Sequence, residues 1–253
     1  MVKSDINKKG ESEMKRLFRL LLALMICTGM IFAAVSCGEE QVSRKDKDKD
    51  EDNYYVGDYI TFGTYEQDND TSNGKEDIEW LVLDKRDDRI LVISKYALDC
   101  QPYNEEYEDI TWEDCILRSW LNDEFLCSAF SEYERAMIPT VTVEAHANPD
   151  YDTDPGYDTQ DKVFLLSLYE ANGYFDSNYE RICNATEYAE AQGVYTVEYD
   201  SANIRSCWWW LRSPGFSQSF AACVDYDSIV NSDGSRVNGV DVAVRPALWI
   251  DLD

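Results

Sequence analysis

The sequence predicts one α+β domain over residues 54–253, built mainly from antiparallel sheet with a few short helices and long loops. Two apolar runs around a charged turn open this region, helix-start signals fill its middle, and apolar strand patterns return at its end. Paired strands, then helices, then strands again favour α+β over a parallel α/β fold. About 200 residues are within the reach of a single domain.

The strand predictions rest on short runs rich in β-branched and aromatic residues. Residues 78–83 and 89–93 flank the charged turn, so we expect them to form a hairpin. The other predicted strands are 58–62, 163–166, 208–211, 221–224 and 242–250.

Four pairs of residues have the spacing of a capping box and predict helix starts. Pro139 should end the second of these helices, and Gly193 the fourth. The pairs are Thr111 with Asp114, Ser131 with Glu134, Ser167 with Glu170, and Asn184 with Glu187.

The N-terminus is typical of an export signal rather than of folded structure. Residues 14–19 are basic, 20–35 carry no charge, and Ala34-Val35-Ser36-Cys37 follows. This ending resembles the lipobox of bacterial lipoproteins, although Leu usually stands where this chain has Ala34. We therefore expect a lipoprotein signal peptide over 1–36, with Met14 as an alternative start and Cys37 lipidated. An ordinary signal peptide and a retained membrane anchor are the alternatives.

Residues 37–53 contain the lipidated Cys37 and a charged segment with almost no apolar residue, which predicts a flexible tether. The domain would then be extracytoplasmic and attached to the bacterial cell membrane through the lipid. The net charge of the chain is −27, and removal of residues 1–36 changes it to −30. Such a charge argues against nucleic acid as a partner and disfavours direct docking on anionic lipid.

The motifs of common enzyme classes are absent, and no catalytic residue is predicted. The sequence has no glycine-rich phosphate loop, no G-x-S-x-G and no H-E-x-x-H, and its one histidine, His146, reads as a loop residue. The six cysteines of the domain form no C-x-x-C motif, and they would allow three disulfides or buried free thiols. They are Cys100, Cys115, Cys127, Cys183, Cys207 and Cys223.

Two places could bind a ligand or an ion. The acidic loop carries Asp150, Asp152, Asp154 and Asp158, which offer the oxygen ligands that calcium prefers, although its spacing departs from an EF-hand. A solvated acidic loop is the alternative. A weaker calcium candidate contains Asp225, Asp227 and Asp233.

The second place is the strand 208–212, where side chains alternate between the two faces of the sheet. We expect Trp209, Arg212, Asp225 and Asp227 to line a site for a sugar or a peptide. The alternative is a central strand that is buried on both faces.

Three motifs stand out in order along the domain: DKVFLLS at 161–167, WWLRSPG at 209–215 and VRPALWI at 244–250. Together with other segments from about residue 55 to the end of the chain, they resemble an uncharacterised family of bacterial domains found in secreted and lipid-anchored proteins. That family has no established activity.

The ending of the chain is distantly similar to the C-type-lectin-like fold that formylglycine-generating enzymes share. Those enzymes hold copper with a closely spaced cysteine pair, whereas Cys207 and Cys223 are 16 residues apart, so the oxidase activity is not implied. The resemblance implies a scaffold that presents loops for binding. We therefore expect a surface lipoprotein that binds an extracellular glycan or protein. An envelope-acting enzyme that uses carboxylates and a passive envelope module are the alternatives.

Overall fold

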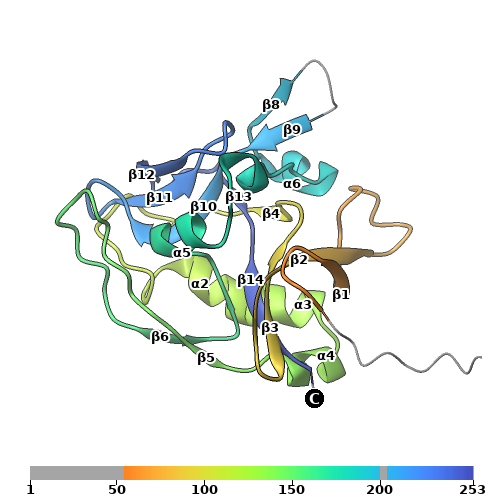
Figure 1. Cartoon of the computed structure of the whole chain (residues 1–253). Coiled ribbons are helices and arrows are strands. Elements are labelled where there is room, and N and C mark those ends of the chain that lie inside the picture. Colours follow the sequence, from red (N-terminus) through yellow and green to blue (C-terminus); the bar gives the residue numbers. More distant parts are fainter. Residues whose placement is uncertain (1–53, 200–203, 253) are drawn as a thin grey trace, which may run out of the picture. The chain divides into compact units, whose positions relative to one another are not determined.

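Two five-stranded sheets organise the domain (Figure 1). The computed structural model describes residues 54–199 and 204–252, which fall within one compact unit. The predicted signal peptide, Cys37 and the tether lie outside the described residues. Neighbouring strands are antiparallel throughout the first sheet, and β10 and β13 are a parallel pair in the second. The α+β prediction is confirmed.

The first sheet has the order β1-β2-β3-β14-β7 and the second β12-β11-β10-β13-β4, and two further strand pairs lie outside them. The first sheet contains β1 (Tyr59–Tyr65), β2 (Glu76–Arg86), β3 (Arg89–Ser94), β14 (Ala247–Asp251) and β7 (Val163–Phe164). The second contains β12 (Val230–Arg236), β11 (Phe220–Val224), β10 (Trp209–Pro214), β13 (Ala243–Val244) and β4 (Asp99–Cys100). The separate pairs are β5 (Val141–Val143) with β6 (Thr159–Asp161), and β8 (Thr196–Tyr199) with β9 (Ile204–Cys207).

The helices are short and most lie between β4 and β8 in the chain. In the described part, no helix is long and apolar enough to cross a membrane. The helices are α2 (Ile116–Trp120), η1 (Leu121–Phe125), α3 (Leu126–Ala129), α4 (Glu132–Met137), α5 (Leu168–Gly173), η2 (Asn178–Arg181) and α6 (Glu187–Gln192).

Two of the four predicted capping boxes are formed, and two are not. The hydroxyls of Ser131 and Ser167 accept a hydrogen bond from the backbone N–H of Glu134 and Glu170. The carboxylate of each glutamate accepts the backbone N–H of its serine in return. The fourth helix instead begins after Thr186, because Asn184 is held in a β-bridge with Ser206. The first begins after Cys115, which makes no side-chain cap.

The predicted strand 242–250 is two strands that belong to different sheets. Ala243–Val244 joins β10 and β4, and Ala247–Asp251 joins β3 and β7. Pro246 lies at the break and has no N–H to donate to a ladder. Arg245, between the strands, is buried, and its Nε donates to the carbonyl of Ser94 at 2.9 Å. The last motif of the sequence therefore joins the two sheets.

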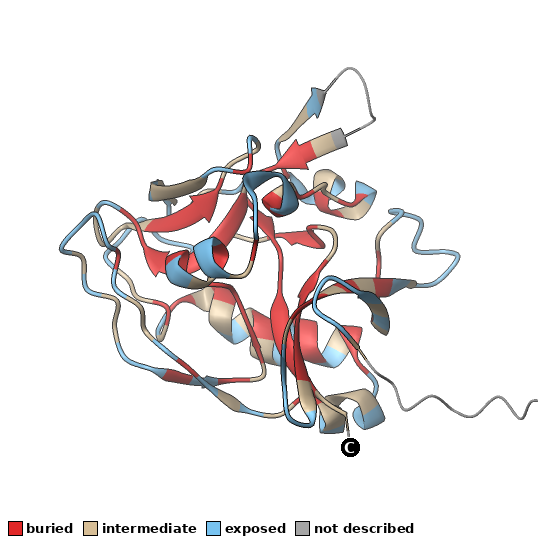
Figure 2. Ribbon diagram, in the orientation of Figure 1, coloured by how far each residue is buried: buried red, intermediate tan, exposed pale blue. Residues whose placement is uncertain are grey.

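Buried residues are concentrated along the strands of both sheets (Figure 2). Trp80, Trp209 and Trp210 are among the largest fully buried side chains. Because Trp209 and Trp210 point to opposite faces of β10, both faces of this strand are covered. The alternative of a doubly buried central strand therefore describes β10.

Candidate functional sites

Trp209 lies inside the domain rather than in an open site. Its indole N–H donates to the carbonyl of Arg181 at 3.3 Å, and the guanidinium of Arg245 lies 5.0 Å from the ring centre. No part of the side chain is accessible to solvent. Trp209 therefore offers no surface to a ligand, contrary to the expectation from the sequence.

Arg212 is also buried, and all its N–H groups are engaged. Nη1 donates to the carbonyl of Leu165 at 2.8 Å, and the two Nη atoms bond the two carboxylate oxygens of Glu170. Nε and Nη2 donate to the carbonyl of Glu144 at 3.3 and 3.0 Å. With no donor left over, Arg212 holds the structure together instead of binding a ligand.

The buried ion pair sets the charge state of Glu170. Burial alone would raise the pKa of this carboxyl, but the charge and hydrogen bonds of Arg212 and the backbone N–H of Ser167 together lower it. Glu170 is thus held as a carboxylate that caps α5 and neutralises Arg212 at once.

His146 lies beside this pair, in the loop between β5 and β6, as the sequence predicts. Its ring stacks on Tyr169 at 5.1 Å, and its Nε2 lies 3.3 Å from a carboxylate oxygen of Glu144. The adjoining hollow, which Trp112 and Pro155 also line, has a volume of about 10 Å³. That is room for about one water molecule, so this hollow holds no substrate.

Asp225 and Asp227 belong to the turn between β11 and β12. The Oδ1 atom of Asp225 accepts the N–H of Ile229 at 2.9 Å, which closes the turn. Asp225 directly follows Val224, which pairs with Trp209 across the β10–β11 ladder. Arg212 lies three residues further along β10 and is therefore away from the turn that carries Asp225. The structure does not bring the four predicted ligand-binding residues together in one open site.

The acidic loop is fastened to the turn between β10 and β11. Gln218 accepts the N–H of Asp154 and donates to its carbonyl, and Thr153 donates to the carbonyl of Gly215. The loop between β5 and β6 therefore passes beside the ends of β10 and β11 (Figure 1).

The loop's carboxylates do not form the expected calcium site. Those of Asp154 and Asp158 each accept a backbone N–H, from Gly156 and from Ala145. Asp150 and Asp152 are exposed, and the four carboxylates do not converge. In the described residues, 54–199 and 204–252, the acidic side chains whose carboxylates do converge are Glu66, Asp68 and Glu76.

Docking of this loop creates an aromatic strip, which we define as Tyr107, Phe220, Phe216 and Tyr151. Successive ring centres are 6.2, 4.4 and 6.3 Å apart. Tyr107 and Phe216 are about half exposed, at 52% and 47%. The guanidinium of Arg236 lies over Tyr107, and the hydroxyl of Tyr151 bonds the carboxylate of Asp233. The sequence gives no local signal for the strip, because Tyr107, Tyr151 and Phe216 come from three separate loops or turns and Phe220 is the first residue of β11.

The turn that carries Phe216 is held close to β12. The N–H of Gly215 donates to the carbonyl of Phe220 at 2.6 Å, and the N–H of Phe216 donates to that of Asp233 at 3.0 Å. A Cβ atom on Gly234 would lie 2.1 Å from the carbonyl of Ala221, so only glycine fits there. These contacts fix the strip in place before any ligand arrives.

The six cysteines of the described part are free thiols, and Cys127 alone among them is exposed. Burial raises the pKa of Cys100 and of Cys115 to about 12. Cys183 and Cys207 are neighbours, since the Cys207 thiol lies 3.3 Å from the carbonyl of Cys183.

No curated protein and no solved structure matches this chain. A family model does match residues 87–252, about two thirds of the chain. The three motifs quoted from the sequence, at 161–167, 209–215 and 244–250, all lie within this span. The chain therefore belongs to the family described as a domain of unknown function (DUF6273).

Proposed function

We propose that this protein is a lipid-anchored, extracytoplasmic binding protein that holds a neutral glycan on the aromatic strip. The single observation that carries the proposal is the chain of four contacting rings on the surface, with Arg236 and Asp233 at its edge. The lectin-like resemblance, which implies loops used for binding, agrees with this position.

The chemistry of the strip suits a sugar. Aromatic rings offer apolar faces, and tyrosine adds a hydroxyl that hydrogen-bonds. A pyranose ring has an apolar C–H face with hydroxyls around its rim, so it can stack on Phe216 and bond Asp233 and Arg236. Since the turn is already rigid, little conformational entropy is lost on binding.

The negative charge of the protein determines which glycans the strip should bind. The chain carries a net charge of −27, and Asp150, Asp152 and Asp154 are exposed on the loop that brings Tyr151 to the strip. An acidic polysaccharide or a phosphate-rich polymer would be repelled there. We therefore favour uncharged or N-acetylated sugars over anionic ones.

The anchor is supported by the sequence. The signal peptide predicted over 1–36 ends directly before Cys37. The charged composition of the 16 residues after Cys37 predicts a tether, for which the expected r.m.s. reach is roughly 20–25 Å. The strip would then be presented close to the membrane, where wall or surface glycans are concentrated. Intact-mass analysis of the native protein should show a diacylated Cys37. A mature protein found in the medium with another N-terminus would contradict the anchor.

The binding test is co-sedimentation with insoluble neutral glycans, together with titration of soluble oligosaccharides. Phe216→Ala and Tyr107→Ala should each weaken binding about 5- to 30-fold, the equivalent of about 1–2 kcal/mol for a stacked ring. Tyr179→Ala is the control, because Tyr179 is 82% exposed but belongs to η2.

Other outcomes would redirect the proposal. If Phe216→Ala and Tyr107→Ala bound the glycan as tightly as the wild-type protein, the ligand would bind elsewhere on the domain. Capture of an envelope protein without any glycan would make the strip a protein interface. Release of reducing sugar during the titration would indicate hydrolysis, the enzyme alternative.

A further inference from the structure

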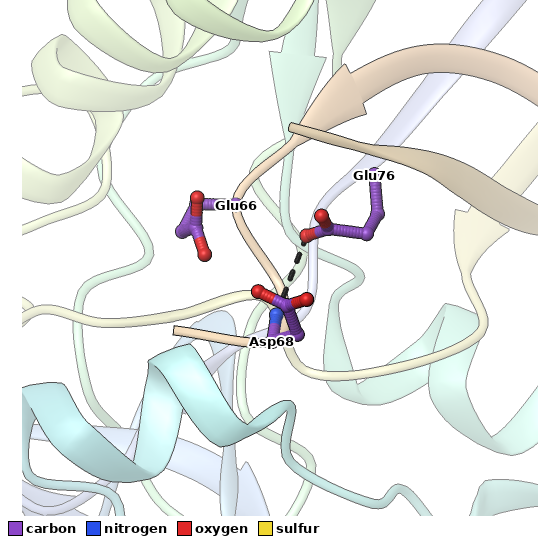
Figure 3. Close-up of side chains that lie close together, drawn as sticks. All are labelled: Glu66, Asp68 and Glu76. Atoms are coloured by element: carbon purple, nitrogen blue, oxygen red, sulfur yellow. Dashed lines mark hydrogen bonds between the residues drawn. The ribbon is translucent and has the colours of Figure 1, made fainter. Parts of the chain in front are cut away.

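Three carboxylates meet at the loop end of the β1–β2 hairpin, where β1 leads into β2. Glu66 directly follows β1, Asp68 lies in the connecting loop, and Glu76 is the first residue of β2, paired with Tyr65. Figure 3 shows the three side chains turned toward a common centre. One carboxylate oxygen from each lies within 4.8 Å of the others. We call these three residues the carboxylate cluster.

Backbone and amide donors orient two of the three members. Glu76 accepts the N–H groups of Gln67 at 2.7 Å and Asp68 at 3.3 Å. Asp68 accepts the N–H of Asp70 at 2.8 Å and the side-chain amide of Asn73 at 2.7 Å. These neutral donors fix where the carboxylates lie but leave their negative charges uncompensated.

Glu66 is the member that needs a partner. It is only 8% exposed, and its Oε1 atom is buried without a hydrogen-bond partner. A buried carboxylate oxygen is retained at a high free-energy cost unless something binds it.

The described part of the chain supplies no cation to this cluster. Within residues 54–199 and 204–252, no ion pair joins the three carboxylates to a lysine, an arginine or the histidine. Lys75, the residue before Glu76, donates instead to the carbonyl of Ser128 at 2.5 Å. The described residues thus leave the compensating charge of the cluster to a cation from solution.

We propose that Glu66, Asp68 and Glu76 form a Ca²⁺ site that fastens the loop between β1 and β2. The donor set is all oxygen, as Ca²⁺ prefers, and a loop that leaves further positions to water suits its variable coordination. Mg²⁺ is a poorer fit, because it demands a near-ideal octahedron and gives up its water reluctantly. The site lies before the span matched by the family model, and on a different loop from Asp150–Asp158.

The test is calorimetric titration of the full-length, chelator-treated protein with CaCl₂. We expect a single site with a dissociation constant of about 10⁻⁵–10⁻³ M, from the weak limit of sensor sites to the range of extracellular modules. Glu66→Gln should weaken binding at least about tenfold, because it replaces the carboxylate whose buried Oε1 atom has no hydrogen-bond partner. The matched control is Asp152→Asn with Asp154→Asn, which removes two charges from the acidic loop and should leave binding unchanged.

A thermal melt separates loss of binding from loss of folding. In chelator, Glu66→Gln should melt at or above the wild-type temperature, since the variant no longer buries an uncompensated carboxylate. Added CaCl₂ should raise the wild-type Tm and leave that of Glu66→Gln unchanged. Absence of any heat or Tm shift for the wild type at about 10 mM CaCl₂ would overturn the proposal. So would binding that survives in Glu66→Gln and disappears in the acidic-loop control.

Discussion

Replacement of Arg212 by methionine should destabilise the domain severely, although the side chain never meets a ligand. The guanidinium is 3% exposed and joins Glu170 to the carbonyls of Leu165 and Glu144. Methionine fills much of the same space but leaves the Glu170 carboxylate without its cation and two carbonyls without donors. Removal of one partner from a buried ion pair costs about 3–5 kcal/mol.

The measurement is urea denaturation at neutral pH, together with a thermal melt. For a domain of about 200 residues, the expected loss corresponds to a fall in Tm of roughly 6–20 °C. Arg86→Met is the control, because the Arg86 side chain is 60% exposed and ion pairs at the surface contribute at most about 1 kcal/mol. The double variant Arg212→Met, Glu170→Met should recover part of the loss, since no charge is then left buried.

One result would refute this reasoning. If Arg212→Met lost less than about 1 kcal/mol, Arg212 would not be held as the structure describes. It would then again be a candidate for contact with a ligand.

Three further predictions follow from burial and backbone geometry. Because the folded pKa of Glu170 is lowered, its contribution to stability is complete above its unfolded pKa and is lost as the pH falls through the folded pKa. Glu170→Gln should therefore flatten the acid limb of a stability–pH curve, and an unchanged limb would contradict this. Gly234→Ala should cost more than about 2 kcal/mol in urea, whereas Gly57→Ala, also at positive φ but with open space around it, should cost less. A thiol reagent should modify Cys127 rapidly in the native protein, and the five buried cysteines of the described part only on unfolding. Rapid modification of any of those five in Cys127→Ser would disprove that arrangement.

The features predicted well from the sequence are those that depend on a few consecutive residues. The Ser131 and Ser167 caps need only a hydroxyl and a glutamate three residues on, and both form. The β2–β3 hairpin needs two apolar runs and a turn. Asn184 fails as a cap because its partner, Ser206, lies 22 residues away, a contact that no local pattern shows.

The candidate sites depend on contacts between distant parts of the chain. Tyr151 reaches Phe216 because the loop between β5 and β6 docks on the β10–β11 turn, and Tyr107 reaches Phe220 from the loop between β4 and α2. Glu66 and Glu76 meet because the hairpin register places them side by side. Tryptophans next to an arginine in a strand looked like a ligand site in the sequence, but the same composition also builds a buried strand.

The buried arginines explain why the recognisable motifs of this chain mislead about ligand binding. Arg212 and Arg245 lie within WWLRSPG and VRPALWI, and each is at most 3% exposed. Arg245 donates to the carbonyls of Ser94 and Arg181 and lies against Trp209, so it joins parts of both sheets. A guanidinium can do this because its planar donors bond several carbonyls while its face packs on an aromatic ring. The motifs thus specify how the sheets are joined, whereas the exposed rings and uncompensated carboxylates lie in the loops and turns between strands.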